Sequence, residues 1–126
     1  MSMANTVLLV DDDPQLSHIV SMYFEIEGFA VLTADTGQKA LELLNDSRPD
    51  VVLLDLMMPG MDGLEVCRRI RANPRLMNLR VIVFTAAETR EEELREAGAD
   101  AFIAKPYSLQ GLGQMVRDLI AARSAS

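Results

Sequence analysis

The stretch VVLLDLMMPGMDG, residues 51–63, decides the fold class, because it joins an unbroken apolar run to a helix start. The run 51–54 lacks the polar alternation of a half-exposed strand, which is typical of a strand covered on both faces, as in a parallel sheet. Asp62 stands three residues before Glu65, an acidic variant of the capping box, and predicts a helix that begins there. The stretch therefore predicts a buried strand followed by a loop and a helix.

Four further apolar runs have the same character, and helical periodicity fills the intervals between them. The additional predicted strands are 7–10, 30–32, 81–84 and 101–104. The predicted helices are 13–28, about 36–44, one from 62 onward, 89–98 and 109–120. In the first helix we expect an inward stripe of Leu16, Ile19, Val20, Tyr23 and Phe24. Five strands alternating with five helices predict an α/β domain with right-handed crossovers and helices on both faces of the sheet.

The composition of the 126 residues excludes several classes of protein. An excess of 19 acidic over 12 basic residues gives a net charge of −7, so the surface would repel nucleic acid and no direct nucleic-acid partner is expected. No apolar run approaches the ~18 residues of a membrane span, so no membrane partner is expected. The one cysteine, Cys67, cannot form an intramolecular disulfide, which suits a cytoplasmic location.

Polar residues follow four of the five predicted strands at the points where those strands end. They are Asp11 and Asp12, Asp55, Thr85 and Lys105. Parallel strands end at a common edge, where open α/β sheets bind ligands, so we expect these side chains to converge. Carboxylates that repel one another must either take up a proton or bind a cation. Hard oxygen ligands select Mg²⁺, Mn²⁺ or Ca²⁺, with Mg²⁺ preferred where water and phosphate oxygens complete the site. A carboxylate beside a metal ion and a lysine can attack phosphorus.

Four motifs give the chain a resemblance to a known family. They are LLVDDD at 8–13, LLDLMMPGMDG at 53–63, VFTA at 83–86 and AFIAKP at 101–106. In these motifs the chain resembles the receiver domain of bacterial two-component response regulators. The resemblance implies a single receiver domain, residues 1–126 with a core of about 6–122. It also implies a flavodoxin-like three-layer sandwich, whose doubly wound parallel sheet has the strand order 2-1-3-4-5.

By this resemblance Asp55 is the phosphoacceptor, which takes a phosphoryl group from a phosphohistidine on a partner histidine kinase or phosphotransfer protein. Asp12 and Asp55 would bind Mg²⁺, or Mn²⁺ in its place, and Asp11 would reach the ion through water. The backbone carbonyl of Met57 would supply a further oxygen ligand. Apart from self-phosphorylation from phosphodonors and autodephosphorylation, no enzymatic activity is expected.

The other matching residues would bind the phosphoryl group and respond to it. Thr85 and the backbone N–H of Ala86 would donate hydrogen bonds to phosphoryl oxygens, Lys105 would pair with another oxygen, and the Lys105–Pro106 peptide would be cis. Thr85 and Phe102 would form the switch that reshapes the face made by the fourth helix, the fifth strand and the fifth helix. A downstream output domain or protein would bind that face, and a phosphorylation-dependent homodimer is a further expectation.

Met57 and Ala87 depart from the family pattern at the positions that tune dephosphorylation. Neither side chain can orient a water molecule by hydrogen bonding. The sequence therefore predicts slower autodephosphorylation than in relatives with amide or acid groups at these positions.

The last two predicted helices have unusual sequences. Residues 90–97 contain only Leu94 and Ala97 as apolar anchors among charged residues, so this helix should shift at low cost. Gly111 and Gly113 each cost about 1 kcal/mol of helix stability relative to alanine, which indicates either a frayed helix start or close packing against a partner.

Two other functions agree with parts of the sequence. Asp11 and Asp13 have the two-apart spacing of metal-dependent aspartyl-phosphate phosphatases of the haloacid dehalogenase type, although this interpretation leaves Asp55 without a role. A receiver-like interaction domain that is never phosphorylated would keep the fold alone, and the complete set of site residues argues against it. The chain is either a stand-alone regulator or a receiver excised from a longer protein.

Overall fold

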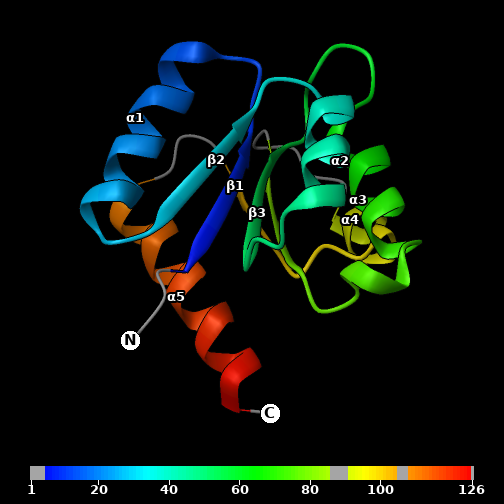
Figure 1. Ribbon diagram of the computed structural model, residues 1–126. Helices are drawn as coiled ribbons and strands as arrows, with labels where there is room; N and C mark the ends of the chain where they lie inside the picture. The colour runs from blue at the N-terminus through cyan, green and yellow to red at the C-terminus, as the bar shows by residue number, and fades with distance from the viewer. Residues whose placement is uncertain (1–4, 86–90, 105–107, 126) are drawn as a thin grey trace.

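The structure, a computed structural model that describes residues 5–85, 91–104 and 108–125, contains one parallel sheet between two layers of helices (Figure 1). The strands are β1 (Thr6–Val10), β2 (Ala30–Ala34), β3 (Val51–Asp55), β4 (Arg80–Thr85) and β5 (Ala101–Ala104). The helices are α1 (Pro14–Ile26), α2 (Gly37–Asp46), α3 (Gly63–Arg71), the 3-10 turn η1 (Pro74–Leu76), α4 (Glu91–Ala97) and α5 (Leu109–Ala125). The strand order β2-β1-β3-β4-β5 confirms the predicted doubly wound fold. In the described ranges no helix is both long and apolar enough to cross a bilayer.

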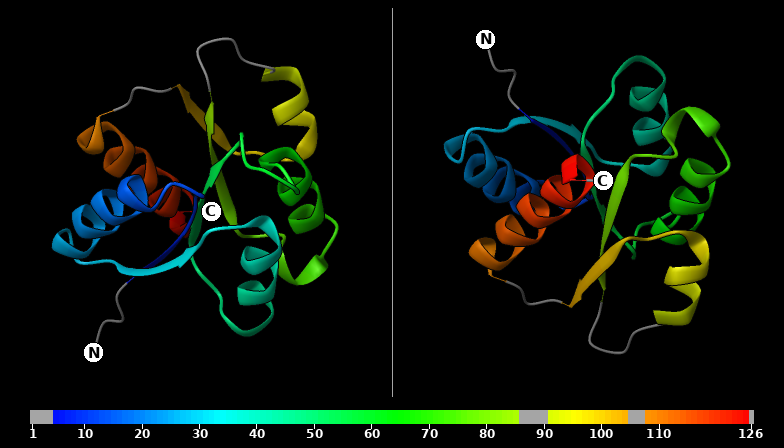
Figure 2. Two further views of the ribbon diagram at one scale, coloured as in Figure 1. Left: turned by 90° about the horizontal axis from the view of Figure 1, so that it is seen from above. Right: turned by 90° about the horizontal axis from the view of Figure 1, so that it is seen from below.

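Successive residues of the central strands point to opposite faces of the sheet and build two separate cores. Leu9, Leu53 and Phe84 pack against α1 and α5 on one face, and Leu8, Leu54 and Val83 belong to the core under α2, α3 and α4 on the other. Figure 2 shows α1 and α5 together on one side of the sheet and the other three helices opposite them. Because both faces are covered, the strands carry continuous apolar runs, as the sequence predicted.

The edge strand β2 is longer than its apolar run. The apolar run predicted that this strand ends at residue 32, but β2 extends to Ala34. Its last two residues, Thr33 and Ala34, pair with Leu9 and Val10 of β1. At the edge of a sheet a strand is less completely covered, and Thr33 is exposed. Apolar character alone therefore underestimates the length of this strand.

The predicted helix starts are confirmed where the structure describes them. Asp13 caps α1 by accepting hydrogen bonds from the N–H groups of Gln15 and Leu16, at 3.0 and 3.3 Å. Asp62 caps α3 by accepting from the N–H of Glu65 at 3.0 Å, while the Glu65 carboxylate pairs with Arg69. The predicted start of the fourth helix at residue 89 lies outside the described residues.

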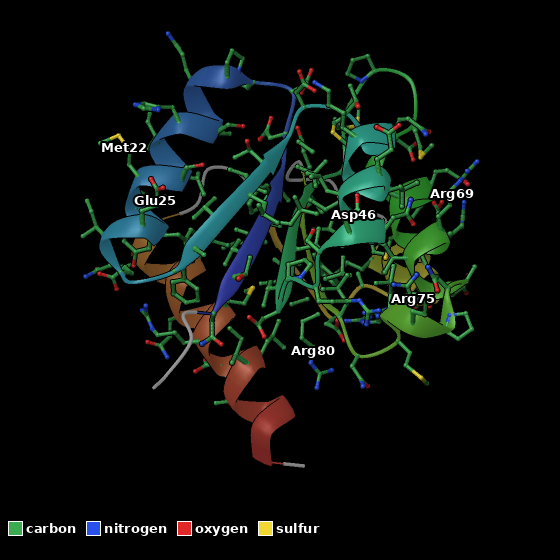
Figure 3. The ribbon with its side chains drawn as sticks, in the orientation of Figure 1. Met22, Glu25, Asp46, Arg69, Arg75 and Arg80 are labelled. Carbon is green, nitrogen blue, oxygen red and sulfur yellow. The ribbon has the colours of Figure 1, made fainter. Side chains whose placement is uncertain are left out.

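The expectation that Ile19 faces the core is wrong. Its side chain is 52% exposed, whereas Val20 and Phe24 are buried. A turn of 3.6 residues puts Ile19 at the margin of the stripe that these residues form, so the helix can leave it in solvent. Figure 3 shows Met22 and Glu25 on the same outward side of α1, away from the sheet.

Gly113 lies where α5 packs closely on α1. A Cβ atom at this position would lie 2.7 Å from the Tyr23 hydroxyl oxygen, so a larger residue would force the Tyr23 ring or α5 to shift. Gly111 is near the helix start, where its N–H donates to Ser108 Oγ at 2.9 Å. Of the two expected explanations the structure supports close packing, but against a helix of the same chain rather than against a partner.

Cys67 of α3 is buried, and burial is the main cause that raises the pKa of its thiol from 9.0 to about 11. A pKa that is higher in the folded than in the unfolded chain stabilises the fold fully below pH 9, and this contribution is lost as the pH rises toward 11. We therefore expect the free energy of unfolding to fall by about 2 kcal/mol more between pH 9 and pH 11 in the unaltered chain than in Cys67→Ala. Urea denaturation across this pH range measures the difference, and parallel pH profiles would contradict the prediction.

Candidate functional site

Three aspartates meet at the carboxyl edge of the sheet. Asp11 and Asp12 follow β1, and Asp55 ends β3, the strand beside it. Each contributes a carboxylate oxygen to a group whose members all lie within 4.8 Å of one another. Asp11 and Asp55 are 2% and 4% exposed, whereas Asp12 is open to solvent. The parallel winding therefore brings these three acids together, with Asp12 at the entrance.

Local backbone bonds hold the buried carboxylates in place. Asp55 Oδ1 accepts a hydrogen bond from the N–H of Met57 at 3.2 Å, and Asp11 Oδ1 accepts one from the N–H of Asp13 at 2.9 Å. The N–H of Asp11 itself donates to the carbonyl of Ala34 at 3.1 Å, which ties the end of β1 to the end of β2. Because each acid is fixed by its own turn, the cluster is preorganised.

Thr85 is the last residue of β4, and its neighbour Phe84 pairs with Asp55 in the sheet. The residue is 1% exposed, and its Oγ1 has no hydrogen-bond partner among the described residues. A buried hydroxyl without a partner costs about 1–3 kcal/mol, so its presence at this edge indicates a site built for a polar ligand.

The donor chemistry of the acidic cluster fits a hard divalent cation. Carboxylate oxygens are the ligands that Mg²⁺ prefers, and two of the three here are buried, where their mutual repulsion is less screened by water. The exposed carboxylate of Asp12 leaves room on one side for water or phosphate oxygens. Asp11, Asp12 and Asp55 are therefore suited to hold Mg²⁺ together.

Of the remaining predicted site residues, the structure describes Met57 and Phe102. The Met57 side chain is 68% exposed beside the cluster. Phe102 of β5 is partly buried against the core under α4, and the Arg95 guanidinium carbon lies 5.5 Å from its ring centroid. The predictions for Ala86, Ala87, Lys105 and Pro106 concern positions outside the described residues.

The sequence interpretation missed a groove beside the cluster. The groove has a volume of about 490 Å³ and lies between α1, the end of β2 and the start of α2, with Asp11, Asp12, His18, Asp35 and Lys39 in its lining. Asp35 directly follows β2, so it occupies the same edge as the other acids. The rule that found the others would have found Asp35 too, had the end of β2 been predicted correctly.

Comparison with known sequences agrees with this arrangement. Residues 7–117 match the family model of the response regulator receiver domain. The chain is 39% identical over 118 residues to the "Probable transcriptional regulatory protein TcrX" of Mycobacterium tuberculosis. The alignment covers 91% of this chain and 49% of that protein, so the chain spans about half the length of this relative.

Solved structures share the fold over nearly the whole chain. The signal receiver domain of a signal transduction histidine kinase from Syntrophus aciditrophicus superposes with a TM-score of 0.88 at 30% identity, covering 94% of this chain and 92% of that one. The receiver domain of the sensor histidine kinase PA1611 from Pseudomonas aeruginosa PAO1 gives 0.86 at 26% identity, covering 94% and 99%, and holds a magnesium ion in its active site cleft. Together with the match over residues 7–117, these likenesses mean that the chain belongs to the response regulator receiver domain family.

Proposed function

We propose that this chain is a phosphoacceptor switch that receives a phosphoryl group on Asp55 from a partner histidine kinase or phosphotransfer protein. The observation that supports this best is the buried Asp55 carboxylate within 4.8 Å of two further carboxylates at the ligand-binding edge of the sheet. A buried acid beside other acids is costly unless the site has a task that uses the charge. Residues 1–126 would act as one domain, with a core of about 6–122.

The proposed reaction is the transfer of a phosphoryl group between two nucleophiles. A carboxylate oxygen of Asp55 forms a bond to phosphorus while the phosphorus–nitrogen bond of the phosphohistidine breaks, and the electron pair remains on the imidazole nitrogen. Asp12, Asp55 and the Met57 carbonyl would hold Mg²⁺ or Mn²⁺, with Asp11 acting through water. When bound, the ion neutralises negative charge on the carboxylates and the phosphoryl oxygens.

The phosphoryl group would then be held and detected by residues on β4 and β5. The buried hydroxyl of Thr85 supports this, because it is available to donate to a phosphoryl oxygen. The N–H of Ala86 and the ammonium of Lys105 would bind the other oxygens, and we propose that the Lys105–Pro106 peptide bond is cis. Movement of Thr85 and Phe102 would reshape the face of α4, β5 and α5, where an output domain or protein would bind.

Labelling with a small phosphodonor tests the proposal. Incubation of the chain with Mg²⁺ and acetyl phosphate should add one phosphoryl group, and peptide mapping after borohydride trapping should find it on Asp55. Rapid turnover of phosphomonoesters that is lost in Asp11→Asn would instead support a phosphatase of the haloacid dehalogenase type. No label and no binding of Mg²⁺ would support an interaction domain that is never phosphorylated.

The partner at the output face follows from the relatives only as a proposal. TcrX is named as a transcriptional regulator, and the PA1611 receiver belongs to a sensor kinase. A receiver that serves either kind of protein acts through protein contacts, and the net charge of −7 disfavours direct contact with nucleic acid. We therefore propose that the α4–β5–α5 face acts on an output domain or protein in the cytoplasm, with a homodimer of the phosphorylated form as a further outcome.

The phosphoryl group on Asp55 is expected to be long-lived, because the exposed thioether of Met57 cannot orient an attacking water molecule. The double substitution Met57→Asn with Ala87→Glu supplies an amide and an acid, and should speed hydrolysis by about tenfold or more. The decay of the label after removal of phosphodonor measures the rate. Met77→Asn is the control, because Met77 is equally exposed, at 71%, but lies beside η1. An unchanged rate in the double variant would show the prediction to be wrong.

A further inference from the structure

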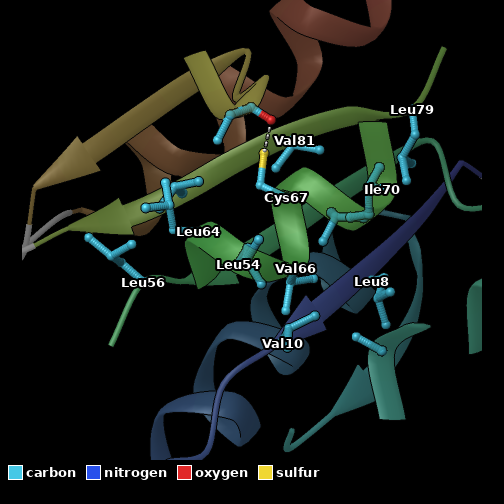
Figure 4. Close-up of a cluster of buried hydrophobic side chains, with 14 of the residues drawn as sticks. Leu8, Val10, Leu54, Leu56, Leu64, Val66, Cys67, Ile70, Leu79 and Val81 are labelled. Atoms are coloured by element: carbon cyan, nitrogen blue, oxygen red, sulfur yellow. Dashed lines mark hydrogen bonds between the residues drawn. The ribbon is translucent and has the colours of Figure 1, made fainter. Parts of the chain in front are cut away.

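The chain that follows Asp55 is anchored on both sides of Met57. Leu56 and Met58 are both buried in the core under α2, α3 and α4, and Figure 4 shows Leu56 among the side chains of that core. The carbonyl of Leu56 also accepts a hydrogen bond from the N–H of Gly63, the first residue of α3, at 3.0 Å. The backbone of Met57 is therefore held in place while its own side chain lies in solvent.

Met57 is also bonded to the acid itself. Its N–H donates to Asp55 Oδ1 at 3.2 Å, so the two residues are in direct contact. Asp55 is 4% exposed, whereas Met57 is 68% exposed. A thioether that oxidants in water can reach therefore belongs to a residue that touches the nearly buried carboxylate.

An exposed thioether is open to oxidation by peroxides. Hydrogen peroxide transfers one oxygen atom to the sulfur: a lone pair of the sulfur forms the S–O bond, the O–O bond breaks, and water leaves. The thioether is thereby oxidised to a sulfoxide, and the peroxide is reduced to water. The sulfoxide has a polar oxygen that accepts hydrogen bonds, where the reduced side chain offers only a weakly accepting sulfur.

We infer that Met57 is an oxidation site and that its sulfoxide shortens the lifetime of the phosphoryl group on Asp55. The inference rests on the proposed function, because it requires a phosphoryl group there. The sulfoxide oxygen accepts a hydrogen bond from a water molecule and holds that water beside the phosphorus atom, which the thioether cannot do. The water oxygen then bonds to phosphorus, the bond from phosphorus to the Asp55 oxygen breaks, and the proton of the water passes to solvent.

The modification changes the duration of the signal and not the ability to receive it. Oxidation of the thioether leaves the carboxylates of Asp11, Asp12 and Asp55 chemically intact, so the oxidised chain can still be phosphorylated. Methionine sulfoxide reductases return a sulfoxide to the thioether, so the effect is reversible. Peroxide therefore shortens the phosphorylated state without destroying the switch.

Met77 provides an internal reference. It is 71% exposed, so peroxide should oxidise it at a rate similar to that of Met57, but it precedes β4 and therefore lies at the edge of the sheet opposite to the aspartates. Met58, at 7% exposed, should be protected. Oxidation of Met77 should not affect hydrolysis, so a comparison of Met57 and Met77 separates a local effect from general damage.

The decay of the phosphoryl label after controlled oxidation tests the inference. The chain is treated with hydrogen peroxide, the peroxide is removed, and peptide mapping measures the fraction of Met57 and of Met77 that carries an added oxygen. The chain is then labelled with acetyl phosphate and Mg²⁺, and the loss of the label is followed after removal of the phosphodonor. The oxidised chain should lose its label about three- to tenfold faster, which is the effect of one added hydrogen bond. Treatment with methionine sulfoxide reductases should restore the slow decay.

Three variants assign the effect to one sulfur atom. Met57→Leu has no sulfur at this position, so its decay rate, whatever its value, should be the same before and after peroxide. Met77→Leu is the matched control and should keep the full response. Met57→Gln carries an acceptor oxygen without any oxidation, and its label should decay about three- to tenfold faster than that of Met57→Leu.

The possible outcomes separate this inference from the proposed function. An unchanged decay rate in a chain whose Met57 is mapped as oxidised would overturn the inference and leave phosphorylation of Asp55 intact. An acceleration that persists in Met57→Leu, or oxidation of Met77 while Met57 stays reduced, would overturn it as well. A failure to label the untreated chain would contradict the proposed function instead. If oxidation prevents labelling, the comparison of Met57→Gln with Met57→Leu decides alone.

Discussion

The Asp55→Asn variant is expected to take up no phosphoryl group from acetyl phosphate and Mg²⁺, while it folds like the unaltered chain. The amide has nearly the shape of the carboxylate, and its oxygen can still accept the hydrogen bond from the N–H of Met57. The amide oxygen is not a nucleophile, unlike the carboxylate oxygen that would attack phosphorus. The loss of labelling should therefore be complete and not graded. Intact-mass measurement after incubation with phosphodonor gives the readout, and circular dichroism confirms the fold.

The same variant should respond more weakly to Mg²⁺. A ligand that binds only the folded state raises the free energy of unfolding. The increase grows with the logarithm of the ligand concentration divided by the dissociation constant of the ligand. Removal of one of three charges that lie within 4.8 Å should weaken Mg²⁺ binding, and the rise in Tm with added Mg²⁺ should shrink.

Asp13→Asn is the matched control for this prediction. Asp13 is adjacent to the cluster in sequence, but its side chain caps α1, and asparagine caps helices about as well as aspartate. The control should keep both the label and the Mg²⁺ response. A label that persists in Asp55→Asn would mean that another residue is the acceptor.

The sequence was sufficient to predict most of the fold because both faces of the sheet are buried. Continuous apolar runs identified all five strands, and residues such as Asp13 and Asp62 marked helix starts through their capping chemistry. The errors fall where burial is partial. The edge strand β2 continues through the exposed Thr33, and Ile19 lies at the margin of its stripe.

The acidic part of the site could be predicted for a different reason, which is topological. Parallel strands end at one edge, so Asp11, Asp12 and Asp55 had to meet once the strands were known. Contacts made by long side chains leave no pattern in the sequence comparable to the position of a residue at a strand end. Arg71 reaches Gly98, which is 27 residues away in sequence, and only the packing of α3 beside α4 shows it.

Gly63 connects the fold to the site, because the first residue of α3 lies against the end of β3 in space. A Cβ atom on this residue would lie 2.5 Å from the carbonyl oxygen of Asp55 and 2.8 Å from the Cα of Leu56. Both obstacles are backbone atoms, which cannot rotate away as a side chain can. The N–H of Gly63 also donates to the Leu56 carbonyl at 3.0 Å, so the helix start and the strand end are bonded at the point of closest approach.

Gly63→Ala is therefore expected to lower the free energy of unfolding by about 3 kcal/mol, because α3 must retreat from β3. Gly37→Ala is the matched control, since Gly37 also begins a helix and is buried, but its Cβ would mainly meet a methyl group of Val66, a side-chain atom, at 2.6 Å. Val66 is itself buried, so this contact also has a cost, but a side-chain methyl can move further than the backbone and the better helix propensity of alanine offsets part of that cost. We therefore expect a smaller loss, of about 1–2 kcal/mol. Urea denaturation measures both values. A cost for Gly63→Ala no greater than for Gly37→Ala would contradict this account.

Because the displaced atoms include the backbone of Asp55, the folded fraction of Gly63→Ala should also accept phosphoryl groups more slowly, and Gly37→Ala should not.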